Sequence, residues 1–437
     1  MSDGGKRPGP ATGALALLVA LAAALMLAST GNERPAASEN APAKPRTLAE
    51  VAIALNERTA NNVELVRGLA FESVPTPQAI TAADLGEIER RELRRGDTLA
   101  GLAADEAAAR ILGLLGDEEE LEGAVASSEE LAAAAYEPRK DELYVVDGTV
   151  AASPPLVEFV LAHELNHALE DQRFGLPDAT KARNDDMALA WMALAEGTAT
   201  ALMVEYAARF LNPITLSLAT LGLDAGTGDV PDFVVKQLEW TYLGGMRFVE
   251  RLRELGGDWK LVDYALAERP PKSTEQVLHP DKYLRDERPV PVAVAGAELR
   301  RRGWKRADAG SIGELGTRQL LERGAVDGAA AAAAGWGGDR FELWRRDVAP
   351  SECMGNCRED FVLVARWAME SPGDGIELAR GLRDYGRTAL GGVPDGAGTL
   401  DLGDGALAIA SSGDVVAAVF APQAGLARTV ATGQIGG

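Results

Sequence analysis

The stretch of sequence that most constrains the fold is "PPLVEFVLAHELNHALEDQRF", residues 154–174. The proline pair suits the first turn of a helix, and Gly175 and Pro177 are typical of a helix end. Two of the three histidines in the chain, His163 and His167, lie here among apolar neighbours. Positions four apart share one face of a helix, so both rings can reach one point. The stretch therefore predicts a buried helix that presents two imidazoles together.

This spacing is that of an H-E-x-x-H zinc site. His163 and His167 would bind the ion, and Glu164 would take a proton from a water whose pKa the metal has lowered. The competing interpretation is a pair of solvated surface histidines, which has to explain the apolar residues on either side. A catalytic zinc also needs a third protein ligand and one open coordination position.

The rest of the motif limits where that third ligand can lie. A metzincin would have Gly at position 170 and His at position 173, but the chain has Glu170 and Arg173. The remaining common solution is a Glu from a following helix. Glu196 lies in "WMALAEGTATALM", where an unpaired carboxylate would be costly to bury. We therefore expect Glu196 to be the third ligand, the alternative being a carboxylate that faces solvent or pairs with an Arg. Weaker candidates for the same role are Asp185, Asp186 and Glu205.

Several motifs together carry a family resemblance. "HELNHALEDQRF", "LAEGTAT", "YLGGMRFV" and "PPKSTEQVLHPDKY" follow one another within residues 136–283. HELNH with a downstream EGTA is similar to the gluzincin, or thermolysin-like, peptidases. The full set resembles a bacterial family of exported or membrane-anchored zinc metallopeptidases, with fainter similarity at "GWGGDR" and "AMESPGDGIELA". This resemblance implies a zincin-like domain, one catalytic Zn²⁺ and a peptide or protein substrate. It also implies His163, His167 and Glu196 as ligands and Glu164 as general base.

The chain departs from thermolysin-like enzymes four residues after the third ligand, where Thr200 replaces an acid. A carboxylate that orients a ligand histidine must then come from elsewhere, or a backbone carbonyl must replace it. Candidates for this orienting role are Asp185, Asp186 and Glu205.

Peptide hydrolysis also needs a donor for the developing oxyanion. His279 lies in the Pro-flanked loop "QVLHPDKY", from which a side chain can reach into a cleft. We expect it to be a catalytic oxyanion donor, with Tyr283 and Tyr242 as rivals. The alternative is a histidine that hydrogen-bonds the loop backbone.

The surrounding sequence indicates mainly helices before residue 289. Helical spacing runs over residues 47–131, with Thr47 and Thr81 as caps, and recurs over 184–210 and 230–257. "AAYEPRKDELYVVDG" predicts a hairpin that ends at residues 147–148. Its second strand, residues 143–146, is by analogy the edge strand that aligns substrate in gluzincins, or else an ordinary internal strand.

Beyond residue 289 the sequence becomes rich in Gly and Ala. Strand candidates cover residues 340–344, 361–369, 406–411 and 414–421, and the last two form a hairpin. Residues 328–340 are a linker or a helix. The predicted fold class is α+β: a mainly helical zincin-like domain with a small hairpin sheet, plus a smaller C-terminal α+β domain. The predicted segments are 1–46, 47–131, 132–288 and 289–437.

The N-terminus predicts export. An uncharged apolar run over residues 11–30 follows Lys6 and Arg7, as in a signal peptide or an N-terminal membrane anchor. The basic flank places the rest outside the cytoplasm, secreted or membrane-anchored, after a disordered spacer to residue 46. A formal charge of -22 argues against nucleic acid as a partner, so membrane contact would occur only through an uncleaved N-terminal segment. In that compartment Cys353 and Cys357 favour a local disulfide.

These observations favour a zinc metallopeptidase. Two alternatives stay open: a zinc hydrolase that acts on another amide or an ester, and a surface or binding protein that keeps zinc as a structural staple. The fourth coordination position distinguishes a catalytic zinc site from a structural one, because water occupies it in a catalytic site and a protein group occupies it in a structural site, or staple.

Overall fold

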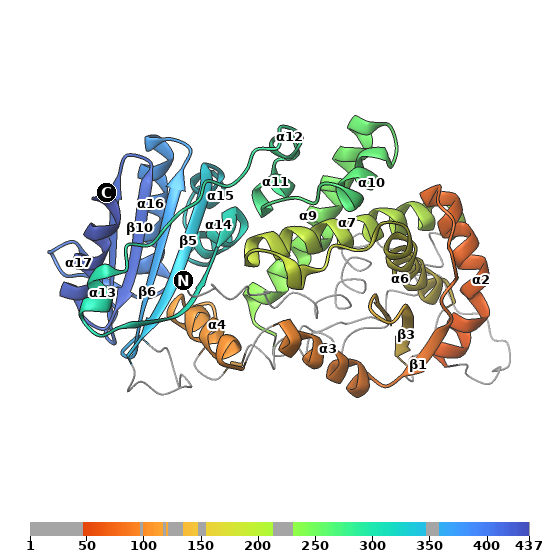
Figure 1. Cartoon of the computed structure of the whole chain (residues 1–437), viewed down its shortest axis with the longest axis horizontal. Helices are drawn as coiled ribbons and strands as arrows, with labels where there is room; N and C mark the ends of the chain where they lie inside the picture. Colours follow the sequence, from red (N-terminus) through yellow and green to blue (C-terminus); the bar gives the residue numbers. More distant parts are fainter. Residues whose placement is uncertain are drawn as a thin grey trace, which may run out of the picture.

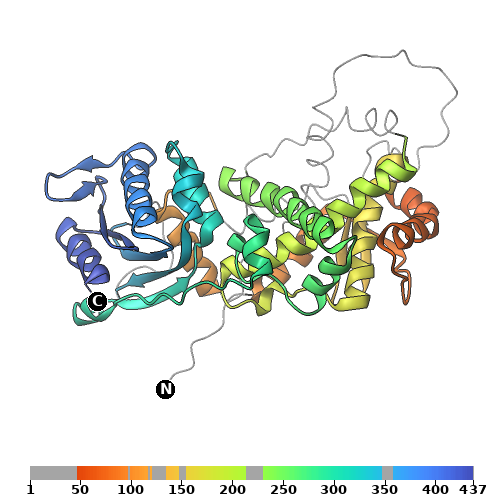
Figure 2. The ribbon, with the colours of Figure 1, turned by 90° about the horizontal axis from the view of Figure 1, so that it is seen from above.

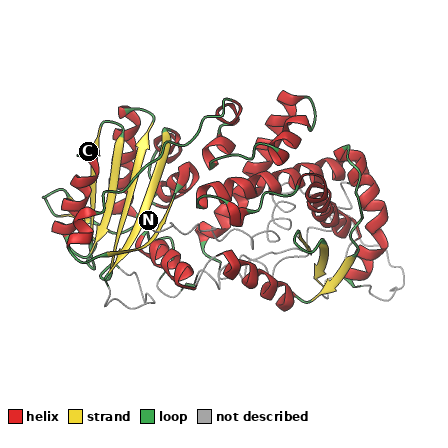
Figure 3. Ribbon diagram, in the orientation of Figure 1, coloured by secondary structure: helices red, strands yellow, loops and turns green. Residues whose placement is uncertain are grey.

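The computed structural model describes residues 47–96, 99–116, 119–120, 134–146, 154–212, 230–346 and 358–436. Over these residues the fold is mixed α+β with two sheets, which confirms the predicted class. The small sheet and the large sheet lie toward opposite ends of the molecule (Figure 3). The apolar N-terminal run, its spacer, residues 147–148 and both cysteines lie outside the described residues.

A helical domain forms one half of the molecule (Figure 1). Its elements are α2 (Leu48–Arg67), β1 (Pro77–Ile80), α3 (Ala82–Gly96), β2 (Ala134–Glu137), β3 (Glu142–Val146), α6 (Pro154–Phe174), η1 (Ala179–Lys181), α7 (Asp185–Phe210), α9 (Asp232–Gly256), α10 (Lys260–Ala267), α11 (Thr274–Leu278) and α12 (Pro280–Leu284).

The helices begin where the sequence places caps. Thr47 forms a capping box with Glu50, and the Thr81 hydroxyl accepts the backbone N–H of Asp84. Asn184 caps α7 in the same way. On α6 every side chain from Val157 to Glu170 is buried, which confirms the prediction of a buried helix.

One core holds the helices that carry the predicted ligands. Side chains from α2, α6, α7 and α9 meet there, among them Val63, Leu165, Leu202 and Phe248. α7 is long and apolar enough to cross a membrane, but 72% of its apolar window is buried inside the protein, as in a core helix. The packing of these four helices fixes the positions of α6 and α7.

The small sheet corrects one expectation. Its order is β1-β3-β2, so β3, which contains residues 143–146, is the central strand. The interpretation of this strand as a substrate-pairing edge is therefore wrong. β1 pairs with it in parallel, with Ala79 opposite Val145, and the hairpin pattern alone cannot reveal a partner from so far upstream. The hairpin itself is confirmed, and β2 is its edge strand.

The C-terminal domain is built on a seven-stranded antiparallel sheet with the order β4-β5-β6-β10-β9-β8-β7. Its elements are α13 (Ala297–Arg301), β4 (Lys305–Gly310), α14 (Gly313–Arg323), α15 (Ala329–Ala334), β5 (Trp336–Arg345), β6 (Phe361–Met369), α16 (Pro372–Thr388), β7 (Val393–Pro394), β8 (Thr399–Asp401), β9 (Ala406–Ser412), β10 (Val415–Ala421) and α17 (Ala424–Ile435). The four strand candidates lie in β5, β6, β9 and β10, and the alanine tract forms α15.

Helices cover both faces of the large sheet, with α14, α15 and α16 on one face and α13 and α17 on the other. An earlier helix, α4 (Leu99–Ile111), joins the first group, because Ala107 and Ile111 pack with Trp336 and Leu363. The described part of residues 47–131 is thus divided: α2 and β1 belong to the helical domain, and α4 packs mainly with the C-terminal domain, with Ala109 in a core cluster of the helical domain. Figure 2 shows the two domains side by side.

Candidate metal centre

Two helices bring the three predicted metal ligands together. His163 and His167 project from α6, and their Nε2 atoms lie 3.1 Å apart. Glu196 comes from α7, with its Oε2 3.2 Å from His163 Nε2 and its Oε1 3.6 Å from His167 Nε2. All three side chains are at most 2% exposed. These residues therefore form one compact buried donor set.

The donor set fits a tetrahedral ion. Two ligand atoms about 2.0–2.1 Å from a tetrahedral zinc stand roughly 3.3 Å apart, close to the three separations above. Several buried polar atoms around the set have no hydrogen-bond partner among the described residues: Nδ1 of both histidines, Oε1 of Glu164 and Oγ1 of Thr200. Buried polar groups are normally paired. Oε1 of Glu164 and Oγ1 of Thr200 therefore suit a site that holds water beside an ion, whereas Nδ1 of each ring points away from the Nε2 atoms that would bind the ion.

Glu164 lies beside the donor set and is held by the edge strand β2. Its Oε2 accepts the backbone N–H of Tyr136 at 3.0 Å, and burial raises its pKa to about 8. The Tyr136 hydroxyl lies 3.0 Å from Asp171 on α6 and 3.0 Å from Asp141. Tyr136 thus contacts α6 at two points and fixes the carboxylate. Sequence reasoning missed Tyr136. Asp171 is seven positions after Glu164 on the same face of α6, and this pair of carboxylates could have indicated one residue that bonds to both.

The electrostatics of the donor set favour a cation. Burial opposes the charge of His167, but Glu196, Glu164 and Glu170 nearby raise its pKa to about 9. Burial lowers the pKa of His163. Burial alone would raise the pKa of Glu196, yet the two histidines lower it to about 2. Glu196 therefore carries a negative charge inside the protein, which either the protonated ring of His167 or a bound metal ion can balance.

A close crossing of α7 and α9 explains Gly197 of the EGTA motif and Gly245 of the YLGG motif. A Cβ atom added to Gly245 would lie 1.9 Å from the Ala193 carbonyl oxygen, and one added to Gly197 would lie 2.3 Å from the carbonyl carbon of Gly245. Because the backbones touch here, α9 brings Tyr242 to the donor set. The Tyr242 and His163 rings stack with centroids 5.8 Å apart.

The three candidates for the oxyanion donor lie in different surroundings. His279 is between α11 and α12, and its Nε2 is 2.8 Å from Oε1 of Glu314 in the C-terminal domain, which raises its pKa. No described contact joins His279 to the donor set. The Tyr283 hydroxyl donates to the Arg269 carbonyl at 2.8 Å. Tyr242 is the candidate in contact with a predicted ligand.

The predicted orienting carboxylates do not reach the histidines. Nδ1 of both rings lacks a hydrogen-bond partner among the described residues, which contradicts the expectation for Asp185, Asp186 and Glu205. Asp186 is ten residues from Glu196, about 15 Å along α7, and accepts hydrogen bonds from Thr274 instead. Glu205 pairs with Arg253 at 2.7 Å.

The carboxylate that does lie near His167 is Glu170, which sequence reasoning used only to exclude a metzincin. Its Oε1 accepts from Arg67 Nε at 2.7 Å, and its Oε2 accepts from the Thr198 hydroxyl at 2.6 Å. Arg67 also donates to Asp263 at 2.6 Å. This buried network joins α2, α6, α7 and α10 next to the ligands.

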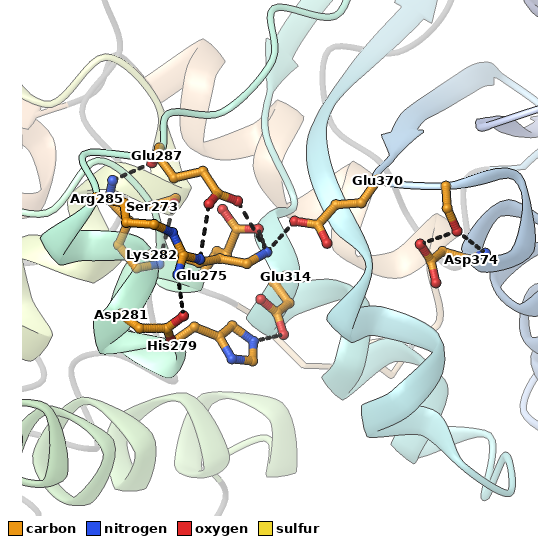
Figure 4. Close-up of polar contacts among 12 residues, drawn as sticks. Ser273, Glu275, His279, Asp281, Lys282, Arg285, Glu287, Glu314, Glu370 and Asp374 are labelled. Atoms are coloured by element: carbon orange, nitrogen blue, oxygen red, sulfur yellow. Dashed lines mark hydrogen bonds and ion pairs between the residues drawn. The ribbon is translucent and has the colours of Figure 1, made fainter.

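A second acidic group lies at the boundary between the domains (Figure 4). Glu275, Glu287 and Glu370 present carboxylate oxygens within 4.8 Å of one another. The ammonium group of Lys282 lies among them, 2.6 Å from Glu275, 3.5 Å from Glu287 and in contact with Glu370. Lys282 already supplies the cation, so we assign no metal to this group.

The comparisons with known proteins concern mainly the C-terminal domain. A family model described as a domain of unknown function, DUF8575, matches residues 300–431. This range begins within α13 and ends within α17. Searches of curated proteins and of solved structures found no match to the chain. The matched region does not include the donor set on α6 and α7.

Proposed function

We propose that this chain is a single-zinc metallopeptidase of the gluzincin type, with a zincin-like helical domain. The observation that carries the proposal is the buried meeting of His163, His167 and Glu196 at separations of 3.1 to 3.6 Å, with Glu164 alongside. The family resemblance of the surrounding motifs supports the choice of peptide or protein as substrate. In keeping with the N-terminal sequence, we propose that it acts outside the cytoplasm.

Each residue has a distinct task in this proposal. The three ligands would hold a zinc ion, which supplies Lewis acidity and lowers the pKa of a bound water. Glu164 would accept a proton from the attacking water and deliver it to the leaving nitrogen. The backbone N–H of Tyr136 holds one oxygen of Glu164, so the carboxylate is oriented before substrate binds. Tyr242 is the nearest candidate to stabilise the oxyanion.

The test compares wild type with Glu164→Gln for zinc content and for hydrolysis of an unstructured protein such as casein. We expect both proteins to bind one zinc per chain and the variant to lose at least about a hundredfold in rate, because it has no general base. Glu158→Gln is the matched control. Glu158 is also buried on α6, but it bonds to Arg58 and Tyr206, so the control should keep both zinc and activity.

Other results would point away from a peptidase. If wild type and Glu164→Gln both bind zinc and are equally inert on many peptides, the peptidase proposal fails and the staple interpretation gains support. Hydrolysis of esters or other amides alone would favour the other zinc hydrolases. If Glu196→Ala keeps full zinc affinity, Glu196 is not the third ligand.

A further inference from the structure

A buried hydrogen-bonded chain lies directly beside the proposed ligands, and no hydrogen bond among the described residues joins it to their side chains. Glu170 is one helical turn beyond His167 on α6, and Thr198 is two residues beyond Glu196 on α7. Glu170 accepts one bond from Arg67 and one from Thr198, at 2.7 and 2.6 Å. We call Arg67, Glu170 and Thr198 the Glu170 bridge. It ties the ligand-bearing part of α6 to the ligand-bearing part of α7.

The Glu170 bridge is held firmly at its α2 end. The side chains of Arg67 and Glu170 are 0% exposed. The Arg67 guanidinium stacks on Trp259 at 4.3 Å and donates to Asp263 at 2.6 Å. At the other end, the Thr198 hydroxyl also lies 2.8 Å from the carbonyl oxygen of Ala195 within its own helix. The position of Glu170 is therefore set from outside α6.

Stability alone gives a poor reason for such a bridge. A buried ion pair gains little over well-packed apolar residues of similar volume, because two charges must lose their water. The bridge instead constrains geometry. Glu170 can accept from both Arg67 and Thr198 only at one relative position of α6 and α7, which we call their offset. That offset also sets the distance from Glu196 to His163 and His167.

We propose that Arg67 and Glu170 are positioning residues, which act through Thr198 to hold Glu196 at the separation from His163 and His167 that one metal ion requires. The inference rests on the proposed metal centre and adds to it the part of the chain that sets its dimensions. It also gives α2, which precedes the zinc motif by about a hundred residues, a function at the site.

The first test uses Thr198→Val, which removes the hydroxyl donor at almost constant size, and Thr198→Ser, which keeps it. We expect zinc affinity, measured by competition with a chelator, to fall by about tenfold or more for Val and to stay near wild type for Ser. The Co²⁺ absorption spectrum of the Val variant should also change, since ligand geometry changes. Thr59→Val is the control, because this hydroxyl bonds to the Leu55 carbonyl and to Tyr206 and not to Glu170 or a proposed ligand.

The second test replaces the pair with apolar residues, in the double variant Arg67→Met and Glu170→Leu. If Arg67 and Glu170 only stabilise the fold, this variant should keep wild-type zinc affinity. If they position the ligands, its zinc affinity should fall at least tenfold with little change in melting temperature. If both Thr198→Val and the double variant keep zinc affinity within threefold of wild type, the positioning role of Arg67 and Glu170 is wrong, but the proposed metal centre still stands. Absence of zinc binding in the wild type would overturn the proposed metal centre itself.

Discussion

At the scale of single residues, some buried ionisable groups in the described part of the chain have no opposite charge as a hydrogen-bond partner. Asp186 is an example distant from the donor set. It is 3% exposed, its oxygens accept from the Thr274 backbone and hydroxyl, and burial raises its pKa to about 8. Near neutral pH the folded protein therefore keeps a proton on this carboxyl group.

This protonation predicts a pH-dependent contribution to stability. In the unfolded chain the carboxyl ionises near pH ~4. Between about pH 4 and pH 8 the folded state holds a proton that the unfolded state has released, so this group makes the protein less stable as the pH rises. Asn resembles the protonated acid and does not titrate. We expect the stability of Asp186→Asn relative to wild type to increase from pH 5 to pH 8, by at most ~1.4 kcal/mol per pH unit.

Urea unfolding at pH 5, 6.5 and 8 measures this difference. Asp232→Asn, on the exposed start of α9, controls for the loss of one charge. A difference between Asp186→Asn and wild type that stays constant over this range would contradict the prediction.

At the scale of elements, the crossing of α7 and α9 leaves no room for a side chain between the two backbones. We expect Gly245→Ala to separate the two helices, because its Cβ atom would overlap the Ala193 carbonyl. Overpacking of this kind costs about 1–3 kcal/mol of unfolding free energy. The same shift would move Tyr242 away from His163, so activity on casein should fall with stability. Thermal unfolding and the activity assay together test this prediction.

Gly244→Ala is the matched control, one residue along α9. Its Cβ atom would meet the side chain of Trp240 at 2.8 Å rather than backbone, and a side chain can turn aside. The control should cost less than Gly245→Ala, because alanine favours the helix by the same amount at both positions, about 1 kcal/mol, and only Gly245→Ala overlaps backbone. Equal losses from both substitutions would show that the backbone contact is not special.

The elements themselves were largely predictable. The predicted helix over 184–210 matches α7 to within one residue, because Asn184 is a good cap and the apolar run ends at Phe210. The strand over 361–369 matches β6. Such patterns report the local backbone conformation. They do not report which faces meet, so the place of β1 beside β3 and of α4 beside the large sheet required the structure.

At the scale of the whole molecule, the segment "PPKSTEQVLHPDKY" connects the domains. Thr274 bonds both Asp186 on α7 and the backbone N–H of Leu315 on α14. Lys282 pairs with Glu275 in its own segment and with Glu370 at the end of β6. With His279 and Glu314, these contacts hold the two domains together (Figure 4).

We expect Lys282→Met to weaken this junction. Without the ammonium group, three neighbouring carboxylates repel one another, and the lost charged hydrogen bonds should cost about 1–3 kcal/mol. The exposed pair Lys236 and Asp232 on α9 offers the control, and Lys236→Met should change stability by at most about 1 kcal/mol. Calorimetry should show the two domains unfolding less cooperatively in Lys282→Met alone. A single unchanged transition would contradict this prediction.

Features that depend on neighbours along the chain could be predicted before any fold was known. His163 and His167 share a helix face because they are four residues apart, and Glu196 stands out because no other charged residue lies between positions 187 and 204. The partners of these residues come from distant parts of the chain, so they depend on how the helices pack. The contact from His163 to Glu196 spans 33 positions, and the bond from Arg67 to Glu170 spans 103. The packing of the domains also places His279 beside Glu314, and no described contact joins His279 to the donor set. The physical reason is that periodicity fixes which side of a helix is buried, while the packing of several helices at once fixes which side chains touch.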